Sequence, residues 1–448
     1  MTTRDRERTM TGAGTGSTGG AVVAGRGQPY RDDQLVVGRP YARLVEAQLE
    51  AWDARPELEE DPRLNLALVS LDARAARSWL QDRDPELVAA ARAAADEAGY
   101  EPSDVDVTLR CLRRVLADRY AGWVPTMGKN RVMSRLTGSY VIDGGGGDGR
   151  PQPLQSYVID GGGVGRPNRP WPPEGSTLLG LRADAPGRGA RVGLVDTRMA
   201  THPWLAGGYI AAAAALLPAR GRVRLPWMAD HATFVAGLVL RQAPGAVIEL
   251  RSGLDDDGSQ DSWTLAQAVA DLADSSTDVV NLSLGCRTED GQPPLVLSAA
   301  IAALGRRTLV VAAAGNHGGT EGGTAPAPSW PAALDDVIAV GALDGGERAA
   351  FSPDAPWVDA MAPGVDVVST CEPQDTGGTV LARWSGTSFA AAAVSGAIAA
   401  QVHQGRTARE AWAELSKGSR HDEDGRPQVA LGRLAGWPAD GRRHGSPR

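Results

Sequence analysis

The sequence predicts an α/β fold built around a largely parallel central sheet. From about residue 177 onward, short runs rich in Val, Ile and Leu alternate with stretches of helical spacing about ten residues long. Most of these short runs are apolar throughout, as expected for parallel strands that are covered on both faces. A region of different composition precedes them, so we expect a small α/β domain ahead of the main one.

Length and composition are those of a globular protein. The 448 residues are 42% hydrophobic, which suits one large domain or two to three smaller ones. A formal net charge of −8 argues against nucleic acid as a partner, because nucleic-acid-binding proteins usually carry a basic patch. Cys111, Cys286 and Cys371 have no regular spacing and predict neither a disulfide framework nor a zinc site. We see no signal-peptide core and no run of about 18 apolar residues, so we expect a cytoplasmic protein without a membrane partner.

Composition divides the first 176 residues into three parts. Residues 1–34 are polar and glycine-rich and are predicted to be a disordered leader. Residues 35–125 are expected to form the small α/β domain, and residues 126–176 a Gly/Pro-rich linker. In this linker the run Ser-Tyr-Val-Ile-Asp-Gly-Gly-Gly occurs twice, starting at Ser139 and Ser156, which is too few copies for a solenoid. The linker is a candidate cleavage region, because proteolysis concentrates in such segments.

Local patterns predict the elements of the small domain. Asp84 as N-cap, Pro85 at the first position and Gly99 just past the end delimit one helix. The domain contains no histidine, so we expect no chemistry there, and a pro-domain or regulatory role rests on its position alone. The predicted elements are helices over 41–52 and 85–98 and strands over 64–71 and 105–109.

The main domain is expected over residues 177–435, followed by a polar tail over 436–448. Its predicted strands cover 191–195, 246–250, 278–282, 308–313 and 337–340. Its predicted helices cover 233–240, 262–273, 295–304, 388–404 and 407–415.

Ser388 is the candidate nucleophile. It follows Gly386 and Thr387 and precedes an alanine-rich run, which places its hydroxyl at the start of a helix able to pack deep in the fold. A helix N-terminus favours developing negative charge. A nucleophile also needs a base and an orienting carboxylate, and without them this serine is only the N-cap of a buried helix.

Three other polar residues stand where catalytic groups of a parallel sheet collect, near the carboxyl ends of strands. Asp196 directly follows an apolar strand, His231 opens a predicted helix, and Asn316 follows the strand over 308–313. Each of them alone has an ordinary structural explanation, such as a turn cap or a core histidine.

The four residues together, each in its own local motif, resemble the subtilisin-like serine proteases (subtilases). Residues 230–237 match the family's Gly-His-Gly-Thr-His-Val-Ala-Gly at five of eight positions. Residues 386–391 resemble its nucleophile motif, and 362–364, Ala-Pro-Gly, the usual upstream marker. The resemblance covers about residues 177–420 and implies a three-layer subtilisin-like fold. It also implies a serine endopeptidase that works through an acyl-enzyme intermediate.

The resemblance assigns a role to each site residue. Ser388 would attack the scissile carbonyl, His231 would accept and return the proton, and Asp196 would orient the imidazole. Asn316 and the Ser388 N–H would bind the oxyanion. The implied substrate-binding residues are Ser283, Leu284 and Gly285, which would pair with an extended substrate, and Ala313, Ala314 and Gly315, whose small side chains suggest an S1 pocket for bulky apolar groups.

The sequence departs from the family pattern around the histidine. Asp230, Ala232 and Phe234 replace two glycines and the second histidine, and Arg198 stands at the usual glycine after Asp-Thr. None of these changes removes a catalytic atom. A carboxylate beside His231 suggests that the active pH range is shifted upward.

Two functions therefore remain open. One is an active serine endopeptidase, and the other is a catalytically inactive subtilase fold that binds peptides or serves as a scaffold. The sedolisins share the Gly-Thr-Ser motif but place Asp at the oxyanion position, so Asn316 argues against them, and the motif order excludes a chymotrypsin-type protease. The expected partners are a peptide or protein substrate and, for the 35–125 domain, the peptidase domain or a regulator. Subtilases are often calcium-bound, but the one dense acidic run, 255–257, is typical of a solvated loop, and we predict no metal or cofactor.

Overall fold

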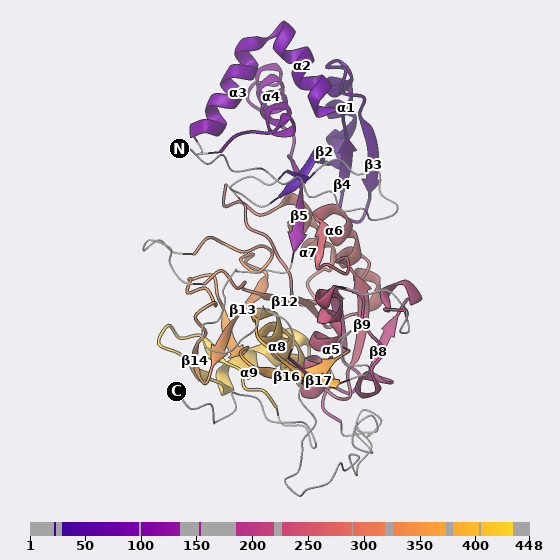
Figure 1. The fold of residues 1–448 in the computed structure, drawn as a ribbon, viewed down its shortest axis with the longest axis vertical. Coiled ribbons are helices and arrows are strands. Elements are labelled where there is room, and N and C mark those ends of the chain that lie inside the picture. The colour runs from indigo at the N-terminus through magenta and orange to yellow at the C-terminus, as the bar shows by residue number, and fades with distance from the viewer. Residues whose placement is uncertain are drawn as a thin grey trace, which may run out of the picture.

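The computed structural model describes residues 22–23, 29–97, 100–134, 152–153, 185–218, 226–288, 290–318, 326–372, 380–402 and 405–432. Within these ranges an N-terminal unit, at the top of Figure 1, sits on a larger unit that contains the predicted site. No helix in the described ranges is long and apolar enough to cross a membrane. The cytoplasmic location expected from the sequence stays a prediction.

The larger unit is organised around a mostly parallel sheet, as the sequence predicts. Its strand order is β18-β19-β15-β13-β12-β11-β7-β9-β8, and every pair from β8 to β19 is parallel. The strands are β7 Arg191–Asp196, β8 Tyr209–Ala211, β9 Val247–Ser252, β11 Val279–Leu282, β12 Leu309–Ala313, β13 Val337–Asp344, β15 Ala360–Pro363, β18 Arg420–His421 and β19 Pro427–Gln428, with β14 Glu347–Arg348 paired to β13. The antiparallel pair β16 Val367–Cys371 and β17 Val380–Trp384 lies outside this sheet, and β17 also pairs with β6 Gln152–Pro153.

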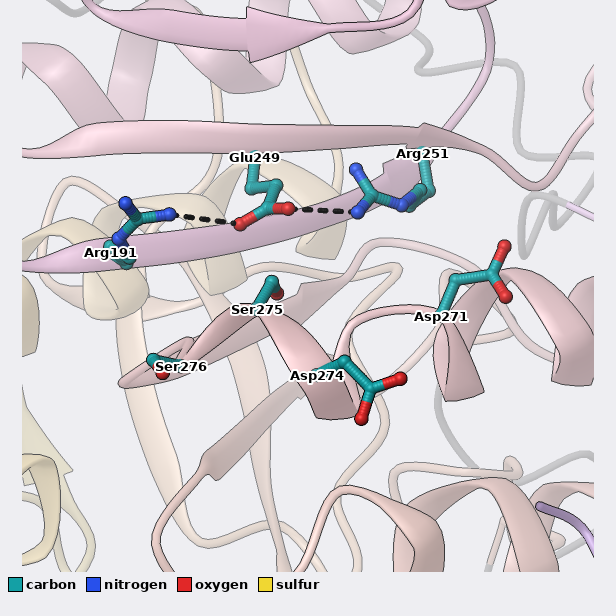
Figure 2. A pocket seen from close by; sticks show the side chains of 7 residues that line it. All are labelled: Arg191, Glu249, Arg251, Asp271, Asp274, Ser275 and Ser276. Atoms are coloured by element: carbon teal, nitrogen blue, oxygen red, sulfur yellow. Dashed lines mark hydrogen bonds and ion pairs between the residues drawn. The ribbon is translucent and has the colours of Figure 1, made fainter.

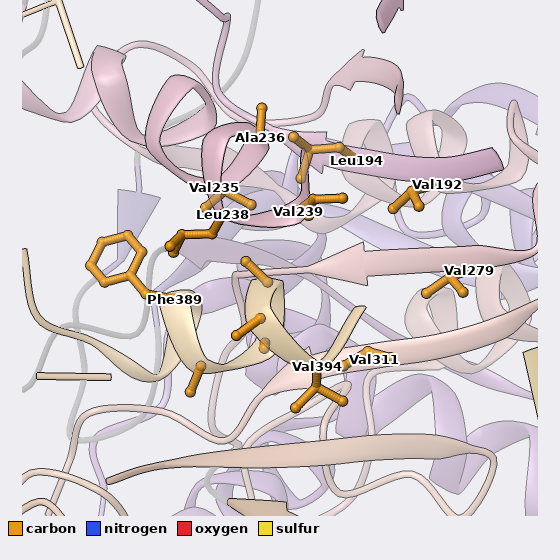
Figure 3. Close-up of a cluster of buried hydrophobic side chains, with 14 of the residues drawn as sticks. Val192, Leu194, Val235, Ala236, Leu238, Val239, Val279, Val311, Phe389 and Val394 are labelled. Atoms are coloured by element: carbon orange, nitrogen blue, oxygen red, sulfur yellow. The ribbon is translucent and has the colours of Figure 1, made fainter. Parts of the chain in front are cut away.

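Helices cover both faces of the sheet, which gives three layers. On one face, α5 His231–Gln242 and α8 Thr387–Gln401 share a buried cluster with strand residues such as Val192, Val279 and Val311 (Figure 3). On the other face, α6 Ser262–Ala270 and α7 Leu295–Ala303 share a second cluster with Val280 and Val310. Neighbouring strand residues point to opposite faces, so apolar strands are buried on both sides. Each predicted helix is present, including α9 Ala408–Gly418.

The N-terminal unit is an antiparallel sheet packed against helices. Its strands are β2 Tyr30–Gly38, β3 Glu57–Asp61, β4 Leu66–Ser70 and β5 Met127–Ser134, with β1 Val22–Val23 paired to β2. Its helices are α1 Ala42–Glu50, α2 Ala73–Arg83, α3 Pro85–Glu97 and α4 Asp104–Arg119. The helices expected over 41–52 and 85–98 and the strand expected over 64–71 are therefore present.

Three sequence expectations for this unit need correction. The segment 105–109 is not a strand but the first turns of α4, which a reciprocal capping box between Ser103 and Asp106 begins. Strand β1 and the start of β2 lie inside the expected leader, and β5 extends the unit to Ser134, inside the expected linker. The duplicated runs at Ser139 and Ser156, the 436–448 tail and most of the leader lie outside the described residues.

Backbone and side-chain contacts join the two units. Strand β5 pairs antiparallel with β10 Ser259–Asp261, just ahead of α6. The Asn130 side chain accepts from the Ser262 hydroxyl at 2.9 Å and from the Trp263 N–H at 3.0 Å, so it caps α6 from the other unit. Arg63 pairs with Asp271 at the other end of this helix.

Candidate active site

The end of β7 and the start of α5 bring Asp196 and His231 together. The distance from His231 Nδ1 to Asp196 Oδ1 is 2.7 Å, and both side chains are fully buried. Asp196 Oδ1 also accepts from the backbone N–H of Thr197 at 2.7 Å. An ionised carboxylate only accepts, so Nδ1 carries the proton and Nε2 is the basic nitrogen. Among the residues that the structure describes, none makes a hydrogen bond to Nε2.

Ser388 is the second residue of α8 and is 3% exposed. Its hydroxyl donates to the carbonyl oxygen of Ser283 at 3.2 Å. The next residue, Phe389, packs its ring against the His231 imidazole with a centroid distance of 5.6 Å. The first turn of α8 therefore adjoins the first turn of α5, and the predicted nucleophile and base lie on neighbouring elements.

Asn316 is held by the residue that precedes the serine. Its Oδ1 accepts from the Thr387 N–H at 2.9 Å and from the Thr387 hydroxyl at 3.0 Å. A Cβ placed on Gly386 would lie 3.5 Å from Asn316 Nδ2, so the amide nitrogen lies beside the start of α8. With Oδ1 occupied as an acceptor, Nδ2 is the group available to donate to a bound oxyanion.

A buried polar chain behind Ser388 was not predicted from the sequence. Ser395 donates to Asn281 Oδ1 at 3.0 Å, Asn281 Nδ2 donates to Ser283 Oγ at 2.9 Å, and Ser283 Oγ donates to the Ser388 carbonyl at 2.9 Å. Ser395 is seven residues after Ser388, so both lie on one face of α8. That spacing was the signal available in the sequence.

The residues expected to bind substrate lie beside these groups. Ser283, Leu284, Ala313 and Ala314 are buried. Gly285 pairs with Ser134 of the N-terminal unit, through N···O distances of 3.2 and 2.9 Å. Gly315 has a φ of +106°, and a Cβ there would lie 2.8 Å from His317 Nδ1, so the position requires glycine.

The acidic run at 255–257 is used in protein contacts. Asp256 pairs with Arg198, whose Nε lies 2.8 Å from Oδ1. Asp257 accepts from the Ser259 hydroxyl at 2.7 Å. In the described ranges no group of three or more His, Cys, Asp or Glu side chains is arranged to hold a metal ion.

A polar surface pocket lies away from these residues (Figure 2). Glu249 on β9 forms two ion pairs there. Its Oε2 lies 3.4 Å from Arg191 Nη1, and its Oε1 lies 2.8 Å from Arg251 Nη2. The pocket contains none of the predicted site residues, and its remaining lining residues are Asp271, Asp274, Ser275 and Ser276.

A parallel sheet that presents a buried Asp–His pair beside a serine at a helix N-terminus is an architecture of serine proteases. Residues 187–418, slightly more than half of the chain, match the model of the subtilase family, peptidase S8. The chain therefore belongs to the subtilase family of serine proteases.

Similar proteins agree with this assignment. The chain is 40% identical over 178 residues to a thermophilic serine proteinase of Bacillus sp. strain AK1, covering 40% of each chain. It is 35% identical over 224 residues to subtilisin BL of Lederbergia lenta, covering 48% of this chain and 76% of that one. In structure it resembles fervidolysin from Fervidobacterium pennivorans, a keratinolytic enzyme related to subtilisin, with a TM-score of 0.59 at 20% identity over 90% of this chain and 60% of that one. This last likeness concerns the fold.

Proposed function

We propose that the chain is a serine endopeptidase in which Asp196, His231 and Ser388 form the catalytic triad. The observation that carries the proposal is the fully buried 2.7 Å hydrogen bond between Asp196 and His231. It holds one imidazole tautomer and leaves Nε2 as the base. The Ser388 hydroxyl lies on the first turn of α8, where it donates to the Ser283 carbonyl oxygen, and in the reaction it would turn to this base.

The chemistry follows from these positions. His231 Nε2 takes the Ser388 proton while Oγ attacks the peptide carbonyl, and Asp196 stabilises the imidazolium that forms. Asn316 Nδ2 and the Ser388 N–H receive the oxyanion, and losing one such donor costs about 3–4 kcal/mol of transition-state stabilisation. The C–N bond then breaks as His231 returns the proton to the leaving amine. Water hydrolyses the resulting ester by the same steps in reverse.

Labelling with a fluorophosphonate probe tests the triad. We expect the probe on Ser388 of the active chain, no label on Ser388→Ala, and unchanged labelling of Ser416→Ala on α9. The label is assigned by mass spectrometry of the modified peptide. A folded protein that takes no label, even after the N-terminal unit is displaced, would favour the peptide-binding or scaffold function instead.

We further propose that the N-terminal unit, residues 29–134, restrains this site. Ser134 pairs with Gly285 on one side and with Ser259 of β10 on the other, so it lies between the strands that a substrate would join. Glu59 supports the docking by accepting from Trp263 Nε1 at 2.8 Å. A substrate must displace β5 before it can pair with Gly285.

Peptidase rates of matched variants test this restraint. Ser134→Pro removes the N–H that donates to Gly285, and Asn130→Ala removes the acceptor of the Trp263 N–H at the start of α6 without touching Gly285. We expect both to raise the initial rate of the intact chain, whereas Arg74→Ala, at an exposed position on α2, leaves it unchanged. Equal rates in all four proteins, wild type included, would contradict the restraint and leave the triad proposal standing.

A further inference from the structure

Asp230, the residue before His231, accepts hydrogen bonds from the end of a strand that lies far along the sequence. Asp230 is 6% exposed, and its Oδ2 accepts from the Cys371 thiol at 2.8 Å and from the Glu372 N–H at 2.6 Å. Cys371 ends β16, 141 residues later in the chain. The carboxylate therefore connects the turn that leads into His231 with the end of this strand.

Two hydroxyls of β16 extend the connection along α5. Ser369 donates to the Phe234 carbonyl and Thr370 to the Thr233 carbonyl, both at 2.6 Å. A Cβ on Gly237 would lie 2.2 Å from Thr370 Oγ1, so only glycine allows this approach. Four consecutive residues of one segment, 369–372, thus contact Asp230 and the first turns of the helix that begins with His231.

The carboxylate is the part of this contact closest to the base. Burial raises the pKa of Asp230, while the hydrogen bonds from Cys371 and Glu372 favour its ionised form. Negative charge at the start of α5 is also favoured by the helix dipole. The imidazole itself is held by the bond from Nδ1 to Asp196 and packs against Phe389 and Trp384. A change at Asp230 would let the backbone of His231 shift while that bond persists.

We propose that Asp230 is a positioning residue for the reaction, which fixes His231 through its hydrogen bonds to Cys371 and to the Glu372 N–H. The proposal rests on the proposed role of His231 as the base. The subtilase motif has glycine at this position. Glycine has no side chain, so these two hydrogen bonds to Asp230 are not part of the motif. A displaced imidazole costs rate rather than substrate affinity, because Ser283 to Gly285, where substrate would pair, are untouched.

Kinetics of Asp230 variants test the proposal. We expect Asp230→Ala to lower kcat by about 10–100-fold with KM within about twofold, since small misplacements of catalytic groups have effects of this size. Asp230→Asn retains an oxygen that accepts from Glu372, so its kcat recovers part of the loss. Asp274→Ala, at an exposed position near α6, serves as the control. Rates are expressed per site labelled by fluorophosphonate, so that unfolded molecules do not count.

A double-mutant cycle with Cys371→Ala shows whether Asp230 acts through this contact. We expect the double variant to be no slower than Asp230→Ala alone, because the two residues share one interaction. Additive losses, or an unchanged kcat per labelled site in Asp230→Ala, would overturn the proposal. If Asp230→Ala does not fold, the same cycle is measured with Asp230→Asn and Cys371→Ala. Additive losses of kcat per labelled site would again overturn the proposal. A wild-type protein without any labelled site would instead contradict the proposed function.

Discussion

Asn316 shows how single residues prepare the site. Thr387 holds its Oδ1 with two hydrogen bonds, which leaves Nδ2 to meet negative charge beside Ser388. We expect Asn316→Leu to lower kcat by about 10²–10³-fold with little change in KM, because the donor acts mainly in the transition state. Steady-state kinetics on a peptide substrate measure this. A rise in KM at constant kcat would show that Asn316 binds the ground state instead.

His317 makes the stability of the fold depend on pH. Burial lowers the pKa of His317 to about 4 from the usual 6.5, and Arg287 adds to this effect. Between pH 6.5 and 4 the unfolded chain binds a proton at this position that the folded chain does not, so folding stability falls as pH falls through this window. We expect His317→Gln to lose about 1–3 kcal/mol less of its free energy of unfolding between pH 7 and pH 4 than wild type does.

Urea unfolding at the two pH values measures the difference. His421→Gln, at an exposed position on β18, is the matched control and should follow the wild type. Parallel curves for wild type and His317→Gln would exclude His317 as the source.

Sequence reasoning located single residues where the signal is local. Asp196, His231, Asn316 and Ser388 each carry their own motif within a few positions, and the structure places Asp196 against His231. Sequence reasoning missed the contact between Asp230 and Cys371, because the two residues are 141 positions apart and no local pattern links them. Hydrogen bonds of this kind are set by the packing of α5 on β16, which no local spacing encodes.

At the scale of elements, the strand wrongly predicted over 105–109 arose because its apolar residues fit both the helical and the strand period. The run over 105–109 is short and β-branched, which favoured a strand, but Leu112 and Leu116 continue its buried face at helical spacing. The strands β7, β9, β11, β12 and β13 were predictable because they are mostly apolar and bounded by turns, whereas β8 and β15 were not predicted.

The two helices that carry His231 and Ser388 pack through glycine. A Cβ on Gly396 of α8 would lie 2.7 Å from the Val239 carbonyl oxygen and 3.0 Å from its Cα, both backbone atoms of α5. We expect Gly396→Ala to destabilise the protein by about 1–3 kcal/mol and to lower kcat, because the helices must separate. Thermal unfolding and kinetics measure the two effects. Gly418→Ala, where a Cβ meets nothing within 4 Å, is the control, and equal behaviour of both variants would contradict this account.

At the scale of the whole molecule, the sequence did not reveal how the two units meet. A composition change near residue 126 suggested a linker, yet β5 lies just past that point and joins β10. The pairing of β5 with β10 depends on tertiary contacts between the two units, such as the hydrogen bond from the Trp263 N–H to Asn130.

In an antiparallel pair the partner residues advance in opposite directions along the two strands. Ser134 faces Gly285, so the residue that would face Ser283 is two positions further, Leu136. The Ser283 carbonyl oxygen lies 3.2 Å from Ser388 Oγ. If the chain cuts itself, this register predicts attack on the carbonyl of Leu136 and a new amino terminus at Thr137.

Intact-mass measurement and amino-terminal sequencing of the purified chain test this prediction. We expect a fragment that begins at Thr137, and none from Ser388→Ala. One glycine inserted between Ser134 and Arg135 places Arg135 two positions after Ser134, so the cut should move to the bond between Arg135 and Leu136. The insertion thus separates selection by register from selection by side chain. A cut that stays after Leu136 would show that the pocket chooses leucine, and a cut in the glycine runs would show that β5 does not direct cleavage at all.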